Sequence, residues 1–213
     1  MTDLQDLHKN EQLLIENHYF PNFNWFKNSI KFSYIIFSST ERYKKMTFRN
    51  RCVVVGSNGL VHLSVPIENG RNQKLPFKEI KIARNEPWQK QHWRTISSCY
   101  GKAPFFEYYA DYFRPFFERE YSFLFDLNLE IINTLNRYIG INQEIIIDND
   151  NSLLGNYDVY KEDLPKGFQE EKGVRYGQLF EDKIGFQSNL SILDLLFMEG
   201  PNAKNILLDN GII

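Results

Sequence analysis

The chain has 213 residues, of which 42% are hydrophobic and 24% charged, and its formal net charge is −2 at pH 7. This length is enough for one substantial core, and the near-neutral charge argues against a general nucleic-acid binder, which usually has an excess of basic residues. No apolar run approaches the roughly 18 residues of a membrane span, and the N-terminus has no signal-peptide pattern, so we expect a cytoplasmic protein without membrane contact.

The N-terminal part of the chain predicts a helix and two strands. Residues 1–12 are polar, and we expect them to be weakly ordered. A turn at residue 21 leads into a short aromatic helix that reaches residue 31, and the apolar run 32–37 predicts a buried strand. Residues 77–82 predict a further strand, because apolar side chains recur along them.

Residues 47–66 predict a β-hairpin, because two β-branched runs flank the turn-forming pair Asn58-Gly59. If Ser57 pairs with Leu60, alternation produces one apolar face and one polar face. The polar face carries Arg49, Arg51, Val53, His62 and Ser64, and Lys45 joins it if the strand extends backwards. A shift of the turn by one residue would place His62 among the core residues instead.

The middle and end of the chain predict helices. Residues 88–139 contain three helical stretches, with an interruption at Pro115 and a stop at Gly140. A short strand at 144–147 and a polar loop at 148–172 follow, and the loop is a candidate lid. A C-terminal helix begins near Asn189, where Ser191-x-x-Asp194 resembles a capping box, and it stops at Gly200-Pro201. We therefore predict an α/β fold with a mixed sheet.

The polar face of the hairpin belongs to a basic segment, residues 41–51, with five Lys and Arg side chains. Guanidinium groups two residues apart on a strand can hold adjacent phosphates or carboxylates. We therefore predict a site for an anionic small molecule, with Arg49 and Arg51 as its main groups and Lys45 in support. The alternative is a solvated edge with scattered surface charges.

His92 shares a predicted helix face with Trp88 and Tyr100 at spacings of four. Spacing alone favours a partly buried structural histidine, and the functional alternative is a general base, since His titrates near neutrality. No Cys or His spacing matches a zinc site, and Cys52 and Cys99 have no activating neighbour in the sequence. We expect two reduced thiols, no metal and no cofactor.

Several short segments follow one another in a fixed order. They are Tyr19-Phe20-Pro21, Tyr43-x-Lys45, Arg49-Asn50-Arg51, Leu63-x-Val65-Pro66, Trp88-x-x-x-His92-Trp93, Tyr100-Gly101 with Pro104-Phe105-Phe106, and the run from Leu190 to Pro201. This series resembles the WbqC-like family of bacterial proteins over roughly residues 14–208. The resemblance predicts that residues 1–213 form a single domain.

The resemblance implies an enzyme of bacterial surface-polysaccharide biosynthesis that transfers an amino acid or acyl group to a sugar. Its donor would be phosphorylated, in agreement with the basic strand. The substrate-binding residues would be Lys45, Arg49, Arg51, His62, Trp93 and Tyr19, and the catalytic residues would be His92 and Tyr100.

The chain also departs from the family pattern. Many relatives have Gln-Pro where this chain has Glu16-Asn17, and acidic residues where it has Ser39-Thr40. These replacements support an alternative function, a non-catalytic binding or assembly protein of envelope biogenesis. A nucleic-acid binder that uses the same basic strand is a further alternative, which the net charge disfavours.

Overall fold

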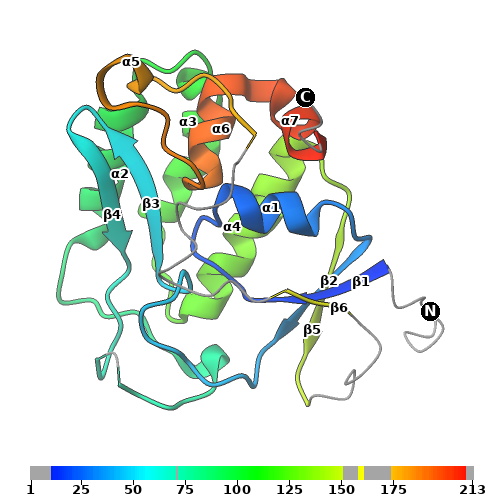
Figure 1. The fold of residues 1–213 in the computed structure, drawn as a ribbon. Coiled ribbons are helices and arrows are strands. Elements are labelled where there is room, and N and C mark those ends of the chain that lie inside the picture. Colours follow the sequence, from blue (N-terminus) through cyan, green and yellow to red (C-terminus); the bar gives the residue numbers. More distant parts are fainter. Residues whose placement is uncertain (1–10, 71, 151–157, 161–173, 210–213) are drawn as a thin grey trace.

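The computed structural model describes residues 11–70, 72–150, 158–160 and 174–209 (Figure 1). It confirms the α/β prediction, with a four-stranded parallel sheet, a separate antiparallel hairpin and a C-terminal helical region. Figure 1 shows the hairpin on one side of the molecule and the parallel sheet on the other, with helices α4 and α6 between them.

The parallel sheet has the strand order β5-β2-β1-β6. Its strands are β1 (Gln12–Ile15), β2 (Tyr34–Ser38), β5 (Glu144–Asp148) and β6 (Asp158–Tyr160). The chain passes outward from β1 through β2 to β5 and then returns to the other side of β1 with β6. In open parallel sheets, ligands often bind at the carboxyl ends of the strands near such a reversal.

The predicted hairpin is confirmed, with a shifted turn. Its strands are β3 (Arg51–Gly56) and β4 (Gly59–Ser64), and Ser57-Asn58 forms the turn between the paired Gly56 and Gly59. His62 therefore lies opposite Val53, two residues from its predicted partner. The turn is displaced by one residue, which moves each pairing by two, so Arg51, Val53, His62 and Ser64 still share a face. The expectation that such a shift would place His62 among the core residues is wrong, since His62 is exposed. Arg49 was also predicted on this face, but it precedes β3 and is buried.

The described helices lie between and beside the hairpin and the sheet. They are α1 (Phe23–Ser29), α2 (Trp88–Tyr100), α3 (Phe106–Phe113), α4 (Leu124–Ile139), α5 (Glu181–Ile184), α6 (Ile192–Glu199) and α7 (Ala203–Leu208). The predicted stop after α4 is confirmed, since Gly140 adopts a left-handed conformation with φ of 79°. No helix in the described part of the chain is long and apolar enough to cross a bilayer.

Three sequence predictions need correction or fall outside the described residues. Residues 77–82 form a short 3-10 helix, Phe77–Glu79, and isolated bridges, because tertiary packing directs the Phe77 ring toward Tyr43 and Phe125. Of the segment predicted to be weakly ordered, residues 1–10 lie outside the described residues, and its last residue, Gln12, begins strand β1. The predicted lid at 148–172 lies mostly outside the described residues, and its described part includes β6.

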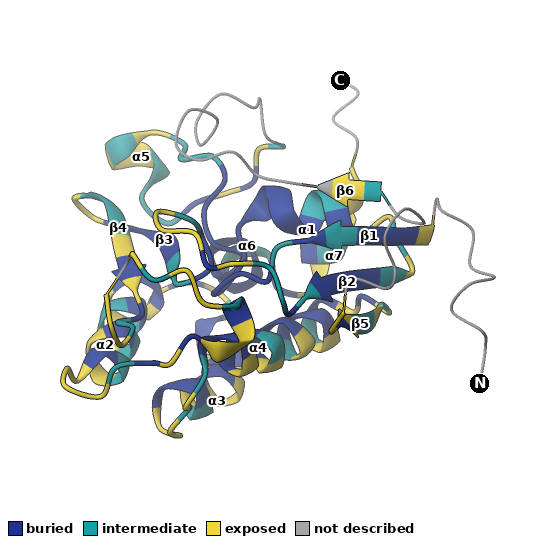
Figure 2. Cartoon of the chain, turned by 90° about the horizontal axis from the view of Figure 1, so that it is seen from below, coloured by how far each residue is buried: buried dark blue, intermediate teal, exposed yellow. Residues whose placement is uncertain are grey.

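An aromatic core connects the two halves of the fold. Phe37 of β2 meets Phe125 of α4 edge-on, with ring centroids 6.5 Å apart, and Phe125 meets Phe77 at 5.6 Å. Figure 2 shows the buried stripe of α4 that this packing produces, and the exposed positions along β4. The hairpin therefore has a buried strand, β3, and a solvent-facing edge strand, β4.

Candidate functional site

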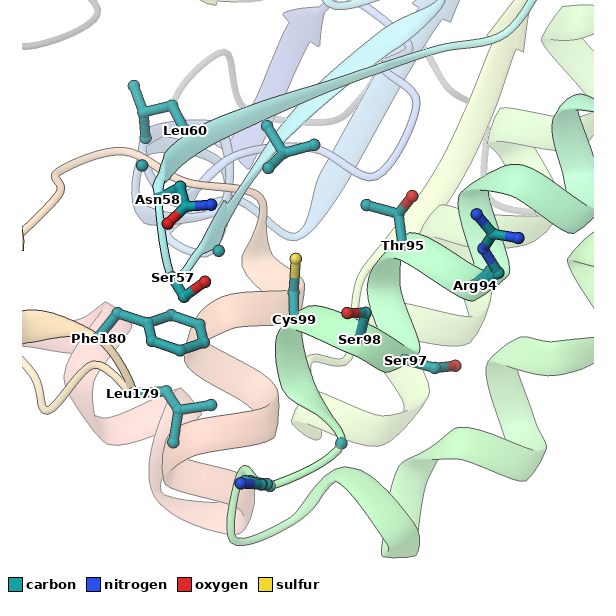
Figure 3. A pocket seen from close by; sticks show the side chains of 15 residues that line it. Ser57, Asn58, Leu60, Arg94, Thr95, Ser97, Ser98, Cys99, Leu179 and Phe180 are labelled. Carbon is teal, nitrogen blue, oxygen red and sulfur yellow. The ribbon is translucent and has the colours of Figure 1, made fainter.

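A pocket of about 950 Å³ lies between the hairpin turn and the end of α2 (Figure 3). This volume is within the range of roughly 300–1,000 Å³ that is typical of small-molecule sites. The turn residues 56–61 form one wall and residues 94–102 form the opposite wall. Leu179 and Phe180 complete the third side.

The lining of the pocket combines polar, aromatic and cationic groups. The hydroxyl and amide side chains are Ser57, Asn58, Thr95, Ser97 and Ser98. Arg94 and Lys102 are exposed cations at the two ends of the α2 wall, and Phe180 presents a ring from the third side. Hydroxyl and amide groups with an aromatic ring suit a sugar, and the cations suit phosphate oxygens.

Cys99 lies on the inner wall of the pocket, where Figure 3 shows its sulfur directed toward the hairpin. A Cβ atom at Gly56 would be only 3.3 Å from this sulfur, so glycine keeps the hairpin close to α2. Burial and the nearby negative charge of Asp194 raise the pKa of the Cys99 thiol. The thiol is therefore protonated at neutral pH and is a poor nucleophile.

A buried carboxylate, Asp194 of α6, lies close to this wall. One of its oxygens accepts hydrogen bonds from the Tyr176 hydroxyl at 2.8 Å and from the Gln178 amide at 3.1 Å. Tyr100 lies near enough to feel the charge of Asp194, and its hydroxyl accepts the backbone N–H of Val55 at 3.2 Å. The second carboxylate oxygen of Asp194, Oδ1, has no hydrogen-bond partner in the described part of the chain. Burial raises the pKa of Asp194 to about 6, although these hydrogen bonds lower it.

Asp194 therefore has a different role from the one predicted for it. Ser191 caps α6 as expected, since its hydroxyl accepts the backbone N–H of Leu193 at 3.4 Å. The carboxylate of Asp194, however, is directed to Tyr176 and Gln178 rather than back to the cap.

Arg49 is the centre of an ion cluster near the carboxyl ends of strands β1 and β2. Its side chain is 1% exposed, and one terminal nitrogen lies 3.0 Å from Glu16 and 2.6 Å from Glu41. The other terminal nitrogen donates to the backbone carbonyl of Arg42, and the guanidinium lies 5.0 Å from the centroid of the Phe77 ring. Arg49 thus already has two anionic partners within the chain.

Glu16 explains one departure from the family pattern, because it is a direct partner of Arg49. Burial raises the pKa of Glu16, but the hydrogen bonds and charges of His18 and Arg49 outweigh this effect and lower the pKa to about 2. Lys44 extends the cluster, 3.0 Å from Glu41 and 4.0 Å from Glu16. Across the described residues, no group of His, Cys, Asp and Glu side chains could hold a metal ion.

His92 is buried beside Tyr19, whose hydroxyl lies 3.0 Å from the Nδ1 atom of the imidazole. The ring also hydrogen-bonds the backbone of Ser64. Burial lowers the pKa of His92 to about 4, although the bond to Ser64 raises it. His92 is therefore neutral near pH 7 and has protein partners for its ring, so its catalytic role stays a prediction.

The other predicted residues lie at separate places. Lys45 is exposed and donates to Asn72 at 3.2 Å, and Arg51 and His62 lie on the face of the hairpin that was predicted to be polar. Trp93 stacks on Phe106 with a centroid distance of 6.1 Å. The eight predicted residues do not converge on the pocket, and none of them is among its described lining residues.

Comparison with known proteins identifies the family of this chain. A sequence profile of the WbqC-like protein family matches residues 17–164. The chain belongs to the WbqC-like protein family. This WbqC-like protein is 26% identical over 227 residues to the uncharacterized protein Rv1507c of Mycobacterium tuberculosis, with 91% of this chain and 96% of that protein covered. No solved structure matches it significantly.

Proposed function

We propose that this WbqC-like protein is a cytoplasmic group transferase of bacterial surface-polysaccharide biosynthesis. It binds a phosphorylated sugar or acyl donor and transfers an amino acid or acyl group to a sugar. The observation that carries the proposal is the pocket, whose volume and mixed polar, aromatic and cationic lining suit such a donor. The link to surface polysaccharide and the transfer reaction depend on the family resemblance alone.

Within this proposal, Arg94 and Lys102 bind the phosphate groups of the donor. They are exposed at the rim of the pocket, whereas Arg49 is buried against two carboxylates and would have to lose one of them to bind a ligand. The hydroxyls of α2 and the turn bind the sugar, and Phe180 stacks on its ring. The hairpin surface with Lys45, Arg51 and His62 is a second candidate for the anion.

Isothermal titration with UDP-N-acetylglucosamine and acetyl-CoA tests this assignment. Removing the two cations in Arg94→Ala/Lys102→Ala should weaken binding by about tenfold or more, because each charge-assisted hydrogen bond contributes about 1.5 kcal/mol or more. Lys90→Ala is the matched control, since Lys90 is an exposed cation on the same helix that does not line the pocket.

Three outcomes discriminate between the assignments. A loss in the Arg94→Ala/Lys102→Ala protein, with wild-type affinity in Lys90→Ala, supports the pocket. A loss confined to Lys45→Ala/Arg51→Ala would move the anion to the hairpin surface. An absence of binding by the wild-type protein to either donor would refute both.

A second candidate function is non-catalytic binding in envelope biogenesis. It is favoured by the raised pKa of Cys99, since no other lining side chain that the structure describes is an activated nucleophile. Release of coenzyme A from acetyl-CoA, with the acetyl group transferred to a sugar acceptor, would favour the transferase. Tight binding without turnover across a panel of acceptors would favour the binding protein.

A further inference from the structure

Helix α3 exposes two neighbouring tyrosine rings. Tyr108 is 64% exposed and Tyr112 is 43% exposed, and they are the two aromatic side chains among the exposed large hydrophobic residues of the described chain. Figure 2 shows α3 at the edge of the molecule, with exposed positions along it. Single exposed apolar residues are common on protein surfaces, whereas adjacent exposed rings form a contact surface that single residues do not.

The rings are held in place by other tyrosines. Tyr108 and Tyr112 are four residues apart on one helix face, and their ring centroids are 6.4 Å apart. Tyr112 stacks on Tyr138 of α4, with a centroid distance of 4.2 Å and an interplanar angle of 28°. Tyr108 meets the buried Tyr109 edge-on at 4.8 Å. Rings that are already fixed lose little conformational entropy when a ligand binds. We call Tyr108, Tyr112 and Tyr138 the tyrosine platform.

The exposed area of the platform fits a small partner surface. If a whole tyrosine side chain offers roughly 200 Å², the exposed parts of Tyr108 and Tyr112 together amount to about 200 Å². A stable protein interface needs about 800 Å² on each partner. The platform is therefore too small to hold a second copy of this chain or another folded protein by itself.

The charges beside the platform are balanced. Asp111 and Arg114 of α3 form an ion pair at 3.5 Å. The other exposed charges nearest in sequence to the three rings are Glu107 and Arg137, which are also of opposite sign. A nucleic acid or an anionic membrane surface is bound by an excess of basic residues, which this surface does not have. The expected partner is therefore uncharged.

An uncharged sugar ring matches both properties of the platform. A pyranose has an apolar C–H face, which packs on an aromatic ring, and a rim of hydroxyl groups. Each tyrosine offers an apolar ring together with a hydroxyl that both donates and accepts hydrogen bonds. Stacking of this kind depends on the apolar face of the sugar and tolerates differences in its hydroxyl groups.

We infer that the tyrosine platform binds a neutral glycan, whose pyranose rings stack on Tyr108 and Tyr112. It is a second site, because none of its three residues lines the pocket. Tyr108 follows the pocket residue Lys102 by six residues, so their Cα atoms are at most about 22 Å apart. The role of this glycan as the acceptor of the transfer rests on the function proposed above, whereas its binding does not.

NMR titration of the full chain with cellohexaose and with N-acetylchitohexaose, two neutral glycans, tests this inference. The aromatic signals of Tyr108 and Tyr112 should shift and saturate as either glycan is added. Tyr121 serves as the internal reference, because its hydroxyl donates to Glu130 at 2.7 Å and it lies outside the platform. Its signal should not move.

Three variants identify the groups that bind. Tyr108→Ala/Tyr112→Ala should weaken glycan binding about tenfold or more, because two stacking rings are lost. Alanine is a good helix former at these exposed positions, so the variant should keep the circular dichroism of the wild-type protein. Tyr108→Phe/Tyr112→Phe keeps both rings and should bind within about threefold of the wild-type protein. Arg114→Ala/Arg137→Ala should bind as the wild-type protein does, because a neutral glycan needs no cation.

Several results would overturn the inference. They are unmoved Tyr108 and Tyr112 signals with both glycans, equal affinity in Tyr108→Ala/Tyr112→Ala and the wild-type protein, and a tenfold loss in Arg114→Ala/Arg137→Ala. A dimer in analytical ultracentrifugation that Tyr108→Ala/Tyr112→Ala abolishes would assign the surface to a second copy and would also overturn it. A failed titration with UDP-N-acetylglucosamine would refute the pocket and leave the platform standing, so the two proposals fail separately.

Discussion

Replacing Glu16 by Gln should destabilise the protein at neutral pH by about 3 kcal/mol. Gln has the shape of a protonated Glu but cannot become charged, and the wild-type pKa is lowered from 4.5 to about 2 in the folded state. A shift of this size corresponds to about 3 kcal/mol, at about 1.4 kcal/mol per pKa unit. Because the folded pKa is lowered, this stability is present above pH 4.5 and is lost as the pH falls toward 2.

Urea unfolding followed by tryptophan fluorescence measures this effect. The difference between wild type and Glu16→Gln should be about 3 kcal/mol at pH 7 and about half of that at pH 3. Glu130→Gln is the control, because Glu130 forms an exposed ion pair with Arg119, and its loss should cost less than about 1 kcal/mol. Equal stability of Glu16→Gln and wild type at pH 7 would refute the account of the Arg49 cluster.

Three further substitutions test one buried carboxylate and two glycines with positive φ. Asp194→Asn should stabilise the protein against urea by about 3 kcal/mol at pH 8 and by less than about 1 kcal/mol at pH 4. The reason is that a carboxyl group with a raised folded-state pKa lowers the free energy of unfolding as the pH increases through that pKa. A destabilised variant at pH 8 would contradict the predicted direction. Gly200→Ala should cost about 2–4 kcal/mol, since φ is +54° and the new Cβ would lie 2.6 Å from the Phe105 ring. Gly185→Ala, with φ of +75° and open space, should cost only about 1 kcal/mol, and equal losses of thermal stability in the two variants would contradict the steric argument.

The local elements could be predicted because their signals are local. The β-branched runs around residues 57–59 predicted the hairpin, and Gly140 marked the end of α4. The register of the hairpin was wrong by two residues, because Ser57-Asn58 and Asn58-Gly59 are both plausible two-residue turns. Residues 77–82 were misassigned, because the position of Phe77 depends on Arg49 and Phe125, which are distant in the sequence.

The candidate site was harder to predict, because its groups come together only in the fold. The basic segment 41–51 was visible as a cluster of charge, but the Glu16 partner of Arg49 is 33 residues away. It reaches Arg49 because Glu16 and Glu41 follow two neighbouring parallel strands. No local pattern identifies such a pair.

The pocket itself is formed by three segments that are distant in the sequence, residues 56–61, 94–102 and 179–180. No motif in the sequence marks Arg94 as part of a site, and Asp194 was predicted to belong to a capping box. The run Ser97-Ser98-Cys99 was the available signal, since small polar side chains on one helix leave space beside a neighbouring turn. Without the position of that turn, the run has no meaning for function.

A crystal structure with UDP-N-acetylglucosamine, at a concentration that saturates binding in solution, tests the proposed pocket most directly. We expect ligand density between the turn 56–61 and the end of α2, with the diphosphate beside Arg94 and Lys102 and the sugar beside Phe180. Density on the hairpin surface at Arg51 and His62, with an empty space beside Phe180, would contradict the proposal.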